Sequence, residues 1–153
     1  MLIRVRRRAT DEGGFTLVEL LVVILIIGIL AAIAIPSFLN QKSKANDVQA
    51  KELARTAQTA AETLATDNGG SYEKLSLGEL KTYEKSIVTK AGSCTGVSAC
   101  VTEASGTATT YKVVAESPVT KDTFTVENSA GTITRSCVAA SSTNKGGCPN
   151  SSW

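Results

Sequence analysis

The feature that most constrains this chain is an apolar stretch near its N-terminus. From Phe15 to Ile35 the sequence reads FTLVELLVVILIIGILAAIAI, and its only ionisable side chain is Glu19. As an α-helix the stretch is roughly 31 Å long, about the thickness of the hydrocarbon core of a bilayer. A secretory signal peptide has a shorter apolar region, followed by a small-residue cleavage site. The sequence therefore predicts a membrane-spanning helix.

Glu19 lies close to the start of this helix. A carboxylate costs on the order of 2.5 to 3.5 kcal/mol near the centre of a bilayer and less near the interface, so such residues usually face a partner. The simpler alternative places Glu19 among the lipid headgroups, where it contacts no protein group. The residues around Glu19 favour the first interpretation.

Those residues resemble a known processing signal. The segment from Gly13 to Glu19 reads GGFTLVE, and four arginines precede it: Arg4, Arg6, Arg7 and Arg8. Over residues 7–36 the chain resembles the prepilin signal of type IV pilins and their pseudopilin relatives. The resemblance implies that a membrane peptidase cuts after Gly14 on the cytoplasmic side and that Phe15, the new N-terminus, is N-methylated. Residues 1–14 are then a leader, and the apolar helix stays in the product.

Gly28 and Pro36 are the helix-weakening residues of this region. Glycine costs about 1 kcal/mol relative to alanine in a helix, and proline removes one backbone hydrogen bond. By themselves they indicate a mild kink. Both fall where the family places them, and the resemblance implies that the segment between them can unwind when the subunit leaves lipid for a filament core.

The resemblance further implies a homopolymer, a helical filament whose core is formed by residues 15–36. Glu19 is expected to pair with the amine of Phe15 on a neighbouring subunit, because two unpaired charges in a dry core are costly. The implied partners are the prepilin peptidase and an assembly platform in the membrane.

The charges separate the leader from the rest of the chain. Residues 1–14 carry four arginines against Asp11 and Glu12, while residues 15–153 carry equal numbers of basic and acidic side chains. The positive-inside tendency predicts a single-pass precursor in the cytoplasmic membrane with its head outside. The resemblance implies that the processed chain is later found in an extracellular pilus on the cell surface. The balanced mature charge does not indicate nucleic acid binding, although a local patch can exist.

The pattern after Pro36 predicts the amphipathic half of one long helix, over residues 37–68. Apolar residues recur at three- and four-residue steps and are expected to face a core: Phe38, Leu39, Ala45, Val48, Leu53, Ala54, Ala57, Ala60, Ala61 and Leu64. Charged residues, Lys44, Asp47, Lys51, Glu52, Arg55 and Glu62, are expected largely on the other face. Asn68-Gly69-Gly70 supplies the helix stop.

Residues 69–153 predict a globular β-rich head. The capping-box spacing at Ser76 indicates a short helix from Ser76 to Lys85, with Tyr72, Leu75, Leu80 and Tyr83 folding it onto the long helix. Strands are expected at 109–116, 123–127 and 132–138, with a fourth at 96–103. The resulting fold class is α+β, a type IV pilin-like ladle in which a long N-terminal helix packs against a small antiparallel sheet of three or four strands.

Four cysteines follow the helix, and in an exported chain they favour disulfides, for which three connectivities exist. Local pairing favours Cys94 with Cys100 and Cys137 with Cys148. Zinc binding is disfavoured because the chain has no histidine and the spacings match no finger or ribbon. A redox role is disfavoured because five residues separate Cys94 from Cys100. Residues 138–147 resemble the exposed loop that such a C-terminal pair bounds in the family, whereas a pair at Cys94 and Cys100 is a departure from it.

No catalytic site or cofactor is expected, because the chain has no histidine, no Gly-rich phosphate loop and no nucleophile elbow. The predicted function is structural, as a major-pilin-like subunit of a filament for adhesion, motility or DNA uptake. Three alternatives are a pseudopilin of a type II secretion or competence system, a low-copy minor pilin or adhesin, and a membrane-anchored enzyme or redox protein.

Overall fold

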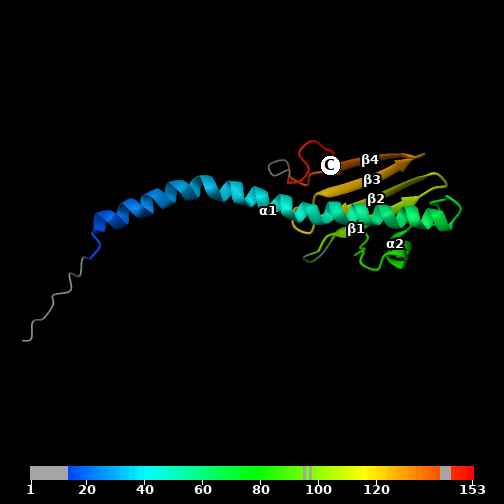
Figure 1. Cartoon of the computed structure of the whole chain (residues 1–153), viewed down its shortest axis with the longest axis horizontal. Helices are drawn as coiled ribbons and strands as arrows, with labels where there is room; N and C mark the ends of the chain where they lie inside the picture. The colour runs from blue at the N-terminus through cyan, green and yellow to red at the C-terminus, as the bar shows by residue number, and fades with distance from the viewer. Residues whose placement is uncertain (1–13, 95, 97, 142–145) are drawn as a thin grey trace, which may run out of the picture. The chain divides into compact units, whose positions relative to one another are not determined.

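The computed structural model of the chain describes residues 14–94, 96, 98–141 and 146–153. The elements in chain order are α1 (Leu17–Asp67), α2 (Leu77–Tyr83), β1 (Cys100–Gly106), β2 (Thr110–Glu116), β3 (Thr123–Ser129) and β4 (Thr132–Val138) (Figure 1). The chain divides into two compact units after Ser37, although α1 continues through both. The α+β class and the predicted long helix are confirmed.

The first unit is the apolar part of α1. Every large apolar side chain from Phe15 to Ile35 is exposed, and Phe15 is 89% exposed. By length and composition α1 can cross a membrane, and no residue of its most apolar 18-residue stretch is buried against the described part of the protein. A helix with an apolar surface on all sides is suited to lipid or to other apolar helices.

In the second unit, α1 packs against one face of an antiparallel sheet whose strands follow chain order, β1-β2-β3-β4. Small side chains at three- and four-residue steps line the buried face of α1: Ala50, Ala54, Ala57, Ala61 and Ala65. Alternate residues of β2 and β3 face it: Tyr111, Val113, Ala115, Phe124 and Val126. The alanines of α1 and these strand residues together form the buried core of the head. The predicted meander is confirmed.

The helix stop and the short helix also form as predicted. The N–H of Gly70 donates to Ala65 O at 2.7 Å, and Gly69 has a φ of 67°, which is the Schellman arrangement that ends helices at glycine. Ser76 Oγ then accepts the N–H of Glu79 at 3.2 Å and caps α2. Leu80 of α2 is fully buried in the main core.

Part of the predicted helix face is wrong. Phe38, Leu39, Ala45 and Val48 are exposed, whereas Asp47, predicted on the polar face, is fully buried. The buried positions of α1 begin only at Asp47, so Phe38 and Leu39 precede the part that the sheet covers. Val48 lies nine residues before Ala57, which is two and a half turns and therefore the opposite side of the helix.

The strand predicted at residues 96–103 begins too early. β1 starts at Cys100, which is bonded to Cys94, and runs to Gly106. β3 extends to Ser129, two residues beyond its predicted end. The following turn places Ala130 and Gly131 at φ values of 49° and 93°, which matches the tight hairpin turn that twisted strands favour.

Candidate functional site

A capping box between Thr16 and Glu19 caps the N-terminus of α1. The N–H and the hydroxyl of Thr16 donate to Glu19 Oε2 at 2.9 and 2.7 Å, and the N–H of Glu19 donates to Thr16 Oγ1 at 3.2 Å. Two backbone donors that would otherwise lack helical partners are thereby satisfied. Sequence reasoning missed this role of Glu19, although the pattern Thr-x-x-Glu before an apolar run signals it.

The peptide bond between Gly14 and Phe15 lies just outside the capped helix. Both residues are exposed and precede Leu17, where α1 begins. A β-carbon built at Gly14 would meet nothing within 4 Å. The bond therefore lies outside the hydrogen-bonded part of α1. Cleavage after Gly14 and methylation of Phe15 stay predictions.

Gly28 and Pro36 both lie inside α1, which is helical on either side of each. A β-carbon at Gly28 would also meet nothing within 4 Å, so no close contact requires glycine there. Their proposed role concerns a different state, the assembled filament, and stays a prediction.

Two disulfides tie loops to the sheet. Cys94 bonds to Cys100 and Cys137 bonds to Cys148, with Cα–Cα distances of 5.7 and 5.8 Å, which is the favoured local pairing. All four cysteines are buried. The loop predicted at residues 138–147 is described only in part, because residues 142–145 lie outside the described residues.

A pair of buried carboxyls, Asp47 and Asp122, joins α1 to the loop after β2. Asp47 accepts hydrogen bonds from the Thr120 hydroxyl and the Gly147 N–H, and Asp122 accepts the N–H of Ala140 at 2.9 Å. Burial raises the pKa of Asp122, and the adjacent Asp47 carboxyl raises it further, against a lowering by the Ala140 hydrogen bond. The pair fixes the C-terminal segment to the helix.

A second polar cluster joins α1 to β2 and β3. Glu62 accepts the hydroxyls of Tyr72 and Tyr111 at 2.6 and 3.0 Å, and the Asn128 amide donates to the Tyr72 hydroxyl at 3.1 Å. Burial and the Glu62 carboxylate raise the pKa of both tyrosines. Both hydroxyls therefore remain donors at neutral pH, and the cluster has a structural role.

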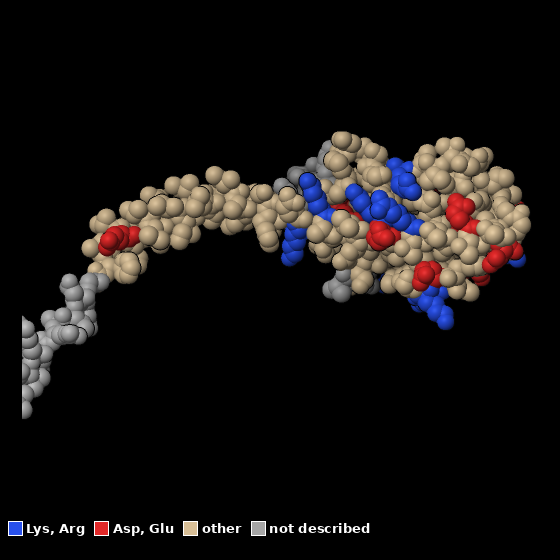
Figure 2. All heavy atoms as spheres, viewed as in Figure 1, with Lys and Arg blue, Asp and Glu red and all other residues tan. Residues whose placement is uncertain are grey.

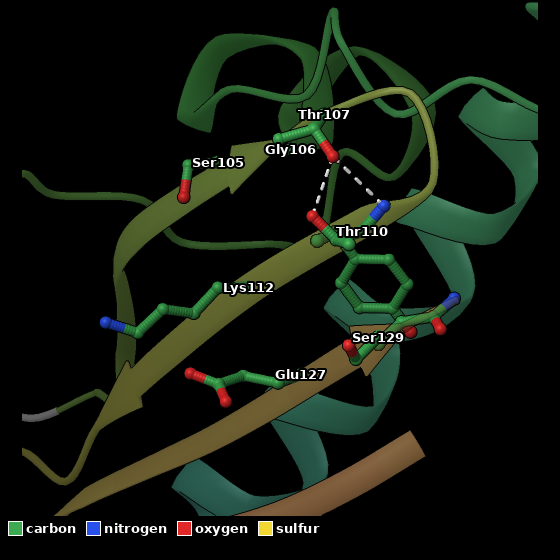
Figure 3. A pocket seen from close by; sticks show the side chains of 9 residues that line it. Ser105, Gly106, Thr107, Thr110, Lys112, Glu127 and Ser129 are labelled. Carbon is green, nitrogen blue, oxygen red and sulfur yellow. Dashed lines mark hydrogen bonds between the residues drawn. The ribbon is translucent and has the colours of Figure 1, made fainter. Parts of the chain in front are cut away.

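A polar hollow lies on the other face of the sheet, near the β1–β2 turn (Figure 3). Ser105, Lys112 and Glu127 form one row across three strands by their register, and Thr107 and Thr110 share a hydroxyl hydrogen bond of 2.7 Å beside them. Lys112 pairs with Glu103 at 3.1 Å. The hollow is lined by hydroxyls, Lys112 and Glu127, and its lining residues include no histidine or cysteine to act as base or nucleophile.

No group of three or more metal-ligating side chains occurs within the described ranges. Of the residues given by the resemblance, Gly14, Phe15 and Glu19 lie at the start of α1, and Gly28 and Pro36 lie farther along it, while the disulfides and polar clusters stabilise the head.

Comparisons with known proteins match the same region. The profile of the prokaryotic N-terminal methylation motif matches residues 10–35. The chain is 41% identical over 64 residues to the type IV major pilin protein PilA of Myxococcus xanthus, covering 42% of this chain and 29% of that protein. It is 40% identical over 62 residues to the type II secretion system core protein G of Escherichia coli, and the match covers 40% of this chain and 43% of that protein.

A third relative extends the match into the head. The fimbrial protein EcpC of Eikenella corrodens is 34% identical over 102 residues, which cover 63% of this chain and 67% of that protein. The chain belongs to the family of type IV pilins and pseudopilins. The alignments of this chain with PilA and with protein G each span less than half the length of those two proteins. No solved structure matches it.

Proposed function

We propose that this chain is a major-pilin-like structural subunit that assembles through its N-terminal helix into an extracellular type IV pilus. The observation that carries the proposal is the first unit, a capped helix whose large apolar side chains are all exposed and which follows an exposed Gly14–Phe15 bond. Such a surface has two suitable environments, lipid before assembly and other copies of the same helix afterwards.

Processing comes first in this proposal. The precursor waits as a single-pass protein in the cytoplasmic membrane, with its arginines inside and its head outside. The peptidase removes residues 1–14 and Phe15 is N-methylated. The mature chain then starts with a positively charged amine on Phe15, directly before Thr16 of the Thr16–Glu19 cap.

Glu19 sets the register of assembly. Its carboxylate pairs with the Phe15 amine of a neighbouring subunit, since insertion in another register leaves both charges unpaired in a dry core. The capping box supports this role, because it holds the carboxylate at the helix start, where the neighbour's amine must arrive. The filament serves adhesion, motility or DNA uptake.

The test is intact-mass and N-terminal analysis of protein sheared from the surface of the native cell. The expected product begins at N-methylated Phe15, is four hydrogens lighter than the reduced chain because it has two disulfides, and is abundant in filaments. A chain that still begins at Met1 would contradict the proposal.

A second candidate is a pseudopilin of a secretion or competence system. The similarity to the type II secretion system core protein G favours it. Under this alternative the same mature mass is recovered from the membrane fraction, and sheared surface material contains none.

A further inference from the structure

Two lysines follow the apolar stretch of α1 without an acidic residue near them in the sequence. Between Glu19 and Asp47, Lys42 and Lys44 are the only charged side chains. Both are exposed, and neither takes part in an ion pair with another described residue. Figure 2 shows cationic side chains on both sides of α1 at the end of the second unit where the helix enters it. This end of the unit therefore has positive charge that is open to an outside partner.

The sheet does not cover this part of α1. Phe38 and Leu39 directly precede the lysines and are 70% and 54% exposed. Buried positions of α1 begin only at Asp47, whose carboxylate already accepts hydrogen bonds from Thr120 and Gly147. The nearest following acid is thus engaged inside the head, and the surface before it offers two apolar side chains followed by two cations.

The position of the lysines along the chain matches the headgroup layer of a bilayer. The apolar residues 15–35 suffice to cross the hydrocarbon core. Lys42 and Lys44 follow Ile35 by about 10.5 and 13.5 Å of helix, and the headgroup layer adds roughly 5 to 8 Å on each side of the core. A lysine can cover such a difference, because its stem lies along apolar surface while its ammonium group reaches the headgroups.

The two lysines also point to different sides of the helix. Residues at positions i and i+2 of an α-helix lie about 200° apart around its axis. A protein surface that packs on one side of α1 can reach only one of these ammonium groups, whereas lipid headgroups surround a helix that crosses a bilayer. The arrangement therefore favours lipid phosphates as the partner over a second copy of this chain.

We propose that Lys42 and Lys44 bind the phosphates of anionic phospholipids at the outer surface of the cytoplasmic membrane, while Phe38 and Leu39 lie at the boundary of the acyl chains. Basic residues next to a membrane span are attracted to anionic headgroups, and apolar side chains enter the boundary layer beside them. The proposal rests on the part of the proposed function in which the chain spans the membrane before assembly. It gives the waiting subunit a fixed depth and a preference for anionic lipid, and neither requires a filament.

The test uses the full chain in phosphatidylcholine bilayers that contain a trace of spin-labelled phosphatidylglycerol or spin-labelled phosphatidylcholine. Electron spin resonance measures the fraction of each probe that the protein immobilises, and the two fractions give the preference for the anionic lipid. K42Q/K44Q should lower this preference at least threefold, because one lysine near an anionic surface contributes roughly a fivefold factor. The arginines of residues 1–14 are the same in both chains, so the difference reports the two lysines.

The matched control is K81Q/K85Q, which removes two exposed charges from α2 and the segment after it and should leave the lipid preference unchanged. K42R/K44R keeps both charges and should keep the preference. The single variants K42Q and K44Q should each remove part of it, and they serve as the test if K42Q/K44Q does not insert. Each single loss has the same cause, a missing cation at the headgroups.

Several outcomes would overturn the proposal. They are an unchanged preference in K42Q/K44Q, an equal fall in the control, and a fall in K42R/K44R as large as that in K42Q/K44Q. Loss of filaments in K42Q/K44Q with an unchanged lipid preference would make the lysines a contact between copies and reject this proposal alone. Absence of filaments from the parent chain, with a lipid preference that depends on the two lysines, would instead reject the proposed function alone.

Discussion

At the scale of single residues, Glu19 combines a helix cap with a charge, and substitution separates the two. Glutamine at this position still accepts hydrogen bonds from Thr16, as the capping box requires, but has no charge. We expect Glu19→Gln and Glu19→Ala both to be inserted and cleaved, and both to form few filaments, because the amine of the neighbouring Phe15 remains unpaired.

The measurement is the ratio of sheared filament protein to processed membrane protein for each variant. If Glu19→Gln assembles normally and Glu19→Ala does not, the cap at Thr16 explains the requirement and the charge pair is wrong. Thr16→Ala is the matched control, because it weakens the cap from the other side and leaves the carboxylate.

Asp122 gives the head a pH dependence of stability with a definite sign. Its pKa in the folded chain is raised by burial and by Asp47, so between the ordinary carboxyl value of about 3.9 and the raised value the folded state binds more protons than the unfolded state. The free energy of unfolding should therefore fall as the pH rises through that window.

Chemical unfolding of the full chain in detergent from pH 4 to pH 7 measures this contribution. Asp122→Asn should flatten the slope relative to the parent chain, whatever its effect on absolute stability. Glu127→Gln, at an exposed position on β3, is the control and should leave the slope unchanged. Equal slopes in the parent and Asp122→Asn would show that Asp122 does not titrate in this range.

At the scale of elements, the β1–β2 turn depends on Gly106 for space. A β-carbon at Gly106 would press on the carbonyl oxygen of Tyr72 and lie 2.7 Å from the Tyr72 β-carbon. The N–H of Tyr72 donates to Thr107 O and holds this segment in place, so the segment would have to shift. Gly106→Ala should destabilise the chain by about 1–3 kcal/mol, as overpacking does. In the helical control Gly78→Ala, the nearest atom is 3.8 Å away, and stability should rise by up to about 1 kcal/mol. Denaturant midpoints compare the two, and equal effects would contradict the packing argument.

The two disulfides should differ in their contribution to stability. Their sequence separations are 11 for Cys137–Cys148 and 6 for Cys94–Cys100. In the chain-entropy model these loops correspond to about 3 and about 2 kcal/mol of stabilisation. The double serine variant at Cys137 and Cys148 should therefore unfold at lower denaturant than the double serine variant at Cys94 and Cys100. The reverse order would mean that loop length does not govern their effect.

Sequence patterns predicted the elements of this chain better than their contacts. The alanine spacing, Gly69 and the Ser76 cap are local signals, so the helix stop, α2 and three of the strands could be placed. The burial of Asp47 could not, because its hydrogen-bond donors, Thr120 and Gly147, lie 73 and 100 residues away in sequence.

At the scale of the whole molecule, the same limit applies to the sites. The prokaryotic N-terminal methylation motif could be recognised because its residues lie within one short stretch of sequence. The contacts of Arg55 and Arg135 with the Trp153 ring could not, since α1, β4 and Trp153 come together only through folding. The proposed pairing of Glu19 with Phe15 cannot be read from one chain, because it needs a second copy.

The assembled state provides the last prediction, at Gly28 and Pro36. In the single chain α1 is helical from one to the other. Pro36 cannot donate to the carbonyl of Ala32, and Gly28 lowers the cost of leaving the helix, so this segment is the weakest part of the apolar helix. When contacts with neighbouring subunits replace lipid, it should be the first part to unwind.

Solid-state NMR of labelled filaments tests this through the Cα chemical shifts of residues 29–35. The shifts should be helical in detergent and should lose helical character in filaments. The variant G28A/P36A removes both weak points, so residues 29–35 should stay helical in its filaments. If unwinding of this segment is needed for the heads of neighbouring subunits to pack, this variant should also form fewer filaments. Helical shifts for residues 29–35 in filaments of the parent chain would show that these two residues serve only the membrane-bound form.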